Sequence, residues 1–152
     1  MDPGPVLLDT DTLSELCRGN HRVVDRARSY LETHGRLTTS AVTVFERLRG
    51  YELAIHEGKP FERQRQSFQA LVAACVVLPF DNDAAAIAAN IWGRAVRSLR
   101  QHLGDILIAS VAVSRQLPLV TRNRRDFEAL AKAARLELHL VDWTRAGAKR
   151  SR

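Results

Sequence analysis

The sequence predicts a single α/β domain, built on a mainly parallel central sheet of about five strands with helices on both faces. Short apolar runs alternate with longer helical patterns along the 152 residues. Strands joined through helices pair in parallel by right-handed crossovers, and such a sheet buries both of its faces under helices. The length and the 45% hydrophobic content suit one buried core rather than two. We therefore expect one domain over residues 1–143, followed by a basic tail over residues 144–152.

The candidate strands are short apolar runs with clear ends. The first run stops abruptly at Asp9, and the third is rich in β-branched side chains and ends before Pro79. Both features are typical of strands in a covered sheet. The five expected strands are residues 6–8, 36–39, 75–78, 117–121 and 136–141.

Helical patterns fill the segments between these runs. Ser40 can cap a helix that carries apolar side chains on one stripe as far as Ile55. Residues 83–103 place apolar side chains at four-residue intervals, which predicts one long amphipathic helix. Residues 105–116 are almost wholly apolar and predict a buried helix. The other expected helices follow Asp9, cover residues 23–32, begin at Pro60 and cover residues 124–134.

The charge balance and the absence of long apolar runs limit the class of protein. The net charge is +6 and arginine dominates the basic residues, which suits bidentate contacts with phosphate groups. A nucleic acid would satisfy this charge, and so would an acidic protein. No apolar run approaches the roughly 20 residues of a membrane span, and residues 1–5 lack the basic and apolar stretches of a signal peptide. We expect a cytoplasmic protein with no membrane segment.

Two aspartates interrupt or end apolar segments, and this position favours a functional role. Ligands of open parallel sheets bind at the carboxyl ends of the strands, where Asp9 stands. We assign the alternative role, capping of the next helix, to Asp11. Asp105 enters an apolar segment, where a carboxylate must be hydrogen-bonded, paired or bound to a cation. Capping of the helix that follows would also satisfy Asp105, so both explanations stay open.

Two further acids have simple local explanations. If Asn123 caps its helix, Asp126 takes the third helical position, where a negative charge favours the helix dipole. Glu46 points away from the apolar stripe of its helix, as a solvated surface residue would. Asp81 and Asp83 are best explained as residues that begin a helix.

The remaining reactive side chains form no recognisable site. The five histidines show no metal-binding spacing. Cys17 and Cys75 lack paired spacing, and we expect both to be free, buried thiols.

Four segments, taken in their order along the chain, resemble the PIN-domain family, in particular the VapC-type toxins of bacterial toxin–antitoxin pairs. Residues 7–16 (LLDTDTLSEL) resemble the opening strand and turn of the family. Residues 40–50 (SAVTVFERLRG) resemble the segment that carries its glutamate. Its third and fourth acidic segments match residues 104–109 (GDILIA) and 119–127 (LVTRNRRDF). Leu103 and Gly104 are a variant of the family's usual approach to the third acid. The resemblance extends from about residue 6 to residue 143.

The resemblance implies a PIN-like three-layer sandwich and a metal-dependent endoribonuclease, the toxin of a type II toxin–antitoxin system. It implies that Asp9, Glu46, Asp105 and Asp126 form the catalytic and metal-binding set. Four carboxylates meeting at one sheet edge would repel one another unless a cation lay among them. Mg²⁺ or Mn²⁺ suits such oxygen ligands and activates water for attack on an RNA phosphodiester. The family further implies a cognate antitoxin and a homodimer.

An acidic site needs cationic groups nearby to attract RNA. Residues beside Asp126 are the expected substrate-binding set: Thr121, Arg122, Asn123, Arg124 and Arg125. Arg97 and Arg100 mark a second basic face on the predicted long helix. A solvated surface explains any one of these arginines equally well.

Two other functions remain open at the level of the sequence. The order Asp9, Thr10, Asp11 after a strand imitates a phosphatase of the haloacid dehalogenase type, in which Asp9 would be the nucleophile. Leu13 does not fit that motif, and neither Lys59 nor Lys132 is well placed for it. The second alternative is a noncatalytic RNA-binding or protein-binding domain of the same fold.

Overall fold

A five-stranded parallel sheet forms the centre of the computed structural model, which describes residues 4–146. The strand order is β3-β2-β1-β4-β5, and all four pairings in this sheet are parallel. This confirms the predicted α/β class and the five-stranded sheet. The strands are β1 Leu7–Leu8, β2 Thr38–Ser40, β3 Val76–Leu78, β4 Leu119–Val120 and β5 Leu140–Val141.

Helices cover both faces of the sheet. Neighbouring strand residues point to opposite faces, and here both kinds are apolar, so each face needs its own layer of helices. Leu7 packs into a core with α5, α7 and α8, whereas Leu8 packs into a core with α1, α2 and α4. The same alternation holds for Leu119 and Val120. The helices are α1 Thr10–Cys17, α2 His21–His34, α3 Ala41–His56, α4 Glu62–Ala73, α5 Asn82–Arg94, α6 Arg97–Arg100, α7 Leu103–Ser114 and α8 Arg124–Ala134. The two cores confirm a three-layer sandwich.

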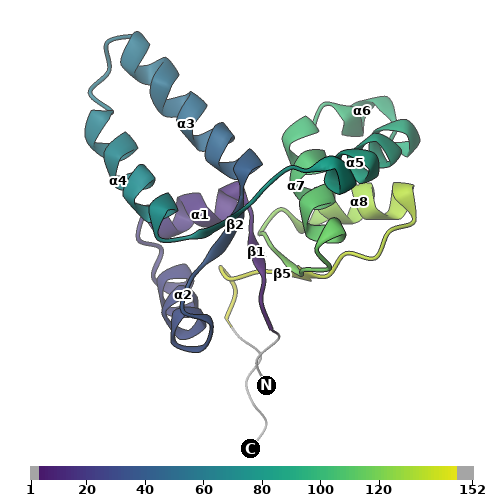
Figure 1. Cartoon of the computed structure of the whole chain (residues 1–152), viewed down its shortest axis with the longest axis horizontal. Helices are drawn as coiled ribbons and strands as arrows, with labels where there is room; N and C mark the ends of the chain where they lie inside the picture. The colour runs from purple at the N-terminus through teal and green to yellow at the C-terminus, as the bar shows by residue number, and fades with distance from the viewer. Residues whose placement is uncertain (1–3, 147–152) are drawn as a thin grey trace, which may run out of the picture.

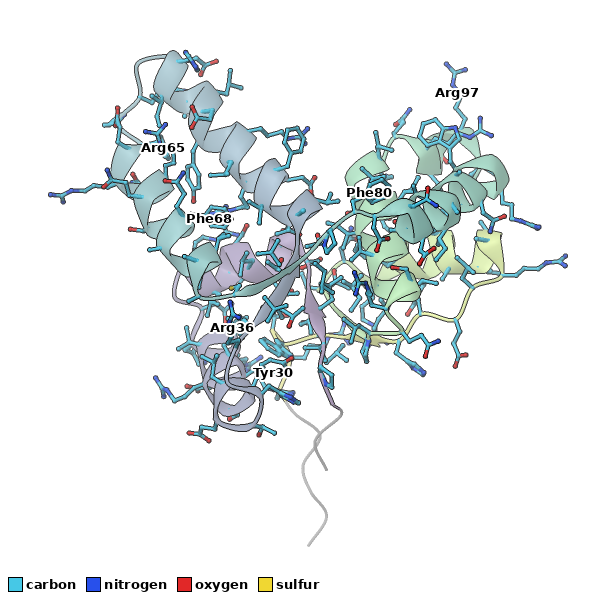
Figure 2. The ribbon with its side chains drawn as sticks, in the orientation of Figure 1. Tyr30, Arg36, Arg65, Phe68, Phe80 and Arg97 are labelled. Carbon is cyan, nitrogen blue, oxygen red and sulfur yellow. The ribbon has the colours of Figure 1, made fainter. Side chains whose placement is uncertain are left out.

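The helices divide into two groups beside the sheet. Figure 1 shows α3 and α4 side by side as an arm that extends away from it, with α5, α6, α7 and α8 gathered on the other side. Phe68 of α4 is directed toward α3, where its ring lies 5.9 Å from the ring of Tyr51 between centroids (Figure 2). Between the two groups, α7 contacts α3. This contact brings together segments that are some sixty residues apart in the sequence.

The predicted single helix over residues 83–103 is wrong. The chain is extended at Ala95 (φ −71°, ψ 141°) and at Val96, so α5 stops and the short α6 follows. Arg100 holds the turn, because its Nε donates to the Trp92 carbonyl oxygen at 3.1 Å and its guanidinium lies over the Trp92 ring. Ala95 is buried and Leu99 is half-buried despite the break. The apolar spacing therefore continues through a point where the helix does not.

Two local predictions meet different outcomes. Asp81 caps α5, because its carboxylate accepts a hydrogen bond from the backbone N–H of Ala84 at 3.0 Å, as expected. Both cysteines are free, but only Cys75 is buried. Cys17 is exposed because it ends α1, so the prediction for it is wrong.

Within residues 4–146, no helix is both long and apolar enough to cross a membrane. Of the predicted basic tail, residues 147–152 lie outside the described part of the chain, as do residues 1–3.

Candidate metal-binding active site

A polar cavity of about 210 Å³ opens where β1 ends and where α1, α3 and α7 begin. Its lining contains three of the four acids singled out in the sequence: the lining residues are Asp9, Thr10, Asp11, Glu46, Asp105 and Asn123. In Figure 1, the first turns of α1 and α3 and the helix α7 surround the upper ends of β1 and β2. The fold therefore gathers these side chains from distant parts of the chain at the sheet edge that was predicted.

Asp9 is the most buried acid of the site, with 3% of its surface exposed. Its Oδ1 accepts the backbone N–H of Thr12 at 2.7 Å, so Asp9 itself caps α1. The assignment of the cap to Asp11 is wrong, because Asp11 lies within the first turn and pairs with Arg122, Oδ2 to Nε, at 3.3 Å. Burial raises the pKa of Asp9 to about 6, against hydrogen bonds from Thr121 and Thr12 that lower it.

Asp105 is the third residue of α7, and 27% of its side chain is exposed. α7 begins without a side-chain capping hydrogen bond, so the capping explanation for Asp105 is not supported. Burial raises its pKa to about 6; the nearby His102 opposes this rise, and the charges of Asp9, Glu46 and Asp126 add to it. Asp105 is thus within electrostatic reach of the other three predicted acids.

Glu46 is not the solvated surface residue that its helical position suggested. Only 21% of its side chain is exposed, and its Oε1 accepts a 2.7 Å hydrogen bond from the Thr10 hydroxyl. Arg49, one turn further along α3, lies 3.7 Å from the second oxygen. The side of α3 opposite its apolar stripe therefore faces α1 and α7 at this point, and not solvent.

Asp126 approaches the cluster from α8, where it is the third residue after the cap position Asn123, as predicted. Ligand atoms of Asp126, Asp105 and His102 all lie within 4.8 Å of one another. His102 was missed at the level of the sequence, where only spacings among histidines were considered. The available signal was a histidine three residues before an acid at the start of a buried helix, a spacing that places both on one face.

The expected substrate-binding residues have different surroundings. Asn123 lines the cavity, and Arg125 is exposed. Arg122 bridges two acids of α1, Asp11 at 3.3 Å and Glu15 at 3.5 Å. Thr121 is fully buried and hydrogen-bonds Asp9, so the side chain supports the cluster from within.

The other arginines lie apart from the cavity lining. Arg124 pairs with Glu128 along α8, with 3.7 Å between their charged atoms. Arg97 projects away from the fold near α6 (Figure 2), whereas Arg100 lies against Trp92. The basic face predicted for Arg97 and Arg100 is therefore divided between a free arginine and one engaged in packing.

The chemistry of the acid cluster suits a divalent cation. Two of its carboxyl groups have raised pKa values; burial is the largest cause in each case, and the like charges of neighbouring acids add to both shifts. A bound cation reverses both effects, because it favours the ionised form of each carboxyl group. Carboxylate oxygens are also the ligands that Mg²⁺ and Mn²⁺ prefer.

The family assignment follows from a comparison with known protein families. The PIN domain family matches residues 6–133, which include all four acids. This chain belongs to the PIN domain family. The predicted resemblance is confirmed, and the phosphatase alternative is set aside.

Known relatives of this PIN domain agree with the assignment. The chain is 36% identical over 108 residues to Ribonuclease VapC5 of Mycobacterium tuberculosis, covering 68% of this chain and 75% of the relative. A crystal structure of DNA-bound VapBC from Salmonella typhimurium matches with a TM-score of 0.70 at 26% identity, over 91% of this chain and 98% of the other. The VapBC-5 structure from M. tuberculosis matches with a TM-score of 0.55 at 32% identity, over 91% and 100% of the two chains.

Proposed function

We propose that this PIN-domain protein is a metal-dependent endoribonuclease and that Asp9, Glu46, Asp105 and Asp126 are its catalytic residues. The observation that carries the proposal is the meeting of these four acids, from four separate segments, at the carboxyl edge of a parallel sheet. Two of them have pKa values raised to about 6, which is typical of groups held in place for function rather than for stability. The relative named Ribonuclease VapC5 supports RNA as the substrate.

The four acids would hold Mg²⁺ or Mn²⁺. Such an ion supplies positive charge that offsets the carboxylates and activates water for attack at phosphorus. Asp9 and Asp105 are the expected principal ligands, because burial leaves both in need of a counter-charge. Glu46 completes the acidic lining of the cavity, and Asp126 stands beside Asp105.

The surrounding side chains hold these acids in fixed positions. The Thr12 N–H and Thr121 orient Asp9, and Thr10 orients Glu46. These contacts restrict the carboxylates before any ligand arrives. A preorganised cluster loses little conformational entropy when it binds, which favours both affinity and rate.

Cationic and amide groups beside the cluster would bind the RNA. Arg122, Arg124 and Arg125 follow β4 and lie in or near the start of α8, next to Asp126 and the cavity residue Asn123. Arginine favours bidentate contacts with phosphate oxygens. This segment would therefore attract the RNA backbone, which the acids repel. Thr121 would act on RNA cleavage only indirectly, through its hydrogen bond to Asp9.

The biological setting is that of a toxin with a cognate antitoxin. The matching structures include VapBC from Salmonella typhimurium and VapBC-5 from M. tuberculosis, and the second is named as a member of the VapBC family of toxin–antitoxin systems. We assign this chain the toxin role, in the cytoplasm, with residues 1–143 as the nuclease domain and a homodimer as the assembly. Binding of RNA without metal-dependent cleavage would instead favour a noncatalytic domain of the same fold.

The test is to incubate the purified protein with tRNA, rRNA and messenger RNA pools, with Mg²⁺, with Mn²⁺ and with EDTA, and to map the new RNA ends. We expect discrete ends with either metal and none with EDTA. The Asp9→Asn variant, purified in the same way, is the control against a contaminating nuclease. Cleavage that persists in EDTA or in this variant would contradict the proposal.

A further inference from the structure

Gly104, the second residue of α7, lies directly against the Glu46 carboxylate. A Cβ atom placed on Gly104 would stand 2.4 Å from Oε2, 2.9 Å from Cδ and 3.3 Å from Oε1 of Glu46. Carbon and oxygen atoms that are not bonded do not approach to 2.4 Å, so any other residue at this position would displace the carboxylate.

This contact separates Gly104 from the other described glycines. A Cβ on Gly4, Gly19, Gly35, Gly50, Gly58 or Gly93 would meet nothing within 4 Å. Four of these have positive φ values, so the backbone explains them, whereas Gly104 is helical. Glycine inside a helix is unfavourable relative to alanine. The reason for glycine at position 104 is therefore the space it leaves.

Two other side chains also contact the Glu46 carboxylate. The Thr10 hydroxyl of α1 bonds its Oε1 at 2.7 Å, and Arg49 approaches its Oε2 at 3.7 Å. A carboxylate displaced by a Cβ would have to leave this position, and a glutamate side chain is flexible enough to do so. The expected result is a folded protein with a misplaced Glu46.

We propose that Gly104 is a positioning residue that admits the Glu46 carboxylate to the acid cluster. It lets α3 present Glu46 against the first turn of α7, one residue before Asp105. The unpaired N–H groups of that turn also favour a negative charge beside them. The consequence for metal binding and cleavage rests on the proposed function, whereas the contact itself does not.

The first experiment compares Gly104→Ala with Gly50→Ala. Gly50 lies in the same helix as Glu46, and a Cβ there meets nothing. We expect both variants to fold with melting temperatures at or above that of the wild type. Gly104→Ala should lose about 10-fold to 100-fold in Mn²⁺ affinity by calorimetry and in kcat, as when a group that orients a metal ligand is lost. Its KM for RNA should change little, and Gly50→Ala should match the wild type.

The second experiment removes the clash from the opposite side. Glu46→Asp shortens the side chain by one methylene, so it should cost less Mn²⁺ affinity in the Gly104→Ala background than in the wild type. Glu46→Ala removes the carboxylate, so Gly104→Ala should raise the melting temperature more in that background. Such coupling identifies a direct contact, because independent substitutions are additive. If Gly104→Ala alone fails to fold, this double-mutant cycle still tests the contact, because Glu46→Ala should then restore folding.

Wild-type Mn²⁺ affinity and kcat in Gly104→Ala would overturn the proposal. So would additive effects of the Gly104→Ala and Glu46→Ala substitutions on the melting temperature. If the wild type itself neither binds Mn²⁺ nor cleaves RNA, the proposed function fails. The melting-temperature cycle would still report whether Gly104 positions Glu46.

Discussion

The backbone N–H of Thr12 donates a 2.7 Å hydrogen bond to Oδ1 of Asp9, so one carboxylate both begins α1 and belongs to the acid cluster. Asn and Asp are about equally good helix caps, so Asp9→Asn removes the charge and keeps the cap. We expect cleavage of labelled RNA to be lost while the melting temperature at pH 7 stays the same or rises. Asp83→Asn, on the exposed first turn of α5, is the matched control. A folded Asp9→Asn protein with wild-type cleavage would remove Asp9 from the mechanism.

The acid cluster should make the metal-free protein less stable as the pH rises. The pKa values of Asp9 and Asp105 rise from 3.8 to about 6 on folding. The folded state then binds more protons than the unfolded state between these values, so the free energy of unfolding decreases from about pH 4 to about pH 6. Each pKa unit corresponds to about 1.4 kcal/mol. Below pH 4 both states are protonated and this penalty is absent.

The measurement is the melting temperature in EDTA over this pH range, for the wild type and for Asp105→Asn. Other carboxyl groups titrate over the same range in both proteins, so the difference between the two curves isolates Asp105. We expect the difference to grow in favour of the variant as the pH rises. A difference that is flat with pH would show that the pKa of Asp105 is not raised in the folded protein.

Much of this fold follows from local patterns in the sequence. Three predictions depend only on neighbouring residues: the run that stops at Asp9, the Ser40 cap, and Asp126 as the third helical residue after Asn123. The structure has all three. The break at Ala95 could not be predicted in the same way, because the apolar spacing continues through it. Arg100 contacts Trp92 across this turn, and such a tertiary contact cannot be derived from the spacing of apolar residues.

The candidate site shows the same division between local and long-range information. The position of Glu46 on its helix predicts the direction of its side chain, but not which residues surround the carboxylate. In the structure, these neighbours include Thr10 and Gly104. The spacing of His102 and Asp105 is visible in the sequence, but their proximity to Asp126 is not, because Asp126 comes from another helix. The four acids could be grouped from the sequence only through family resemblance. Their proximity depends on the contact between α3 and α7.

A divalent cation should stabilise the protein, because it binds the folded cluster and not the unfolded chain. At a concentration 100 times its dissociation constant, a ligand adds about 2.7 kcal/mol to the free energy of unfolding. We expect millimolar Mg²⁺ or Mn²⁺ to raise the melting temperature at pH 7, and Asp105→Asn to reduce this rise strongly. Asp83→Asn should respond as the wild type does. No shift in the wild type would argue against a preformed metal site.

Arg122 should contribute to RNA binding through its charge. It stands at the carboxyl end of β4 and bridges Asp11 and Glu15 of α1. We expect Arg122→Gln to weaken RNA binding and to reduce the slope of log affinity against log salt by about one. Arg28→Gln, on the exposed surface of α2, is the control with the same change of charge. Equal effects of the two variants on the salt slope would assign no particular role to Arg122.

His102 should affect which metal the cluster prefers. Its Nδ1 lies 3.8 Å from Oδ2 of Asp105, and an atom of Asp126 lies within 4.8 Å of both residues. Imidazole suits Ni²⁺ better than Mg²⁺, which prefers oxygen ligands. We expect His102→Gln to lower the affinity for Ni²⁺, measured by competition with Mg²⁺ in calorimetry, while the affinity for Mg²⁺ changes little. An equal loss for both ions would show that His102 acts on the shape or charge of the cluster and not as a nitrogen ligand.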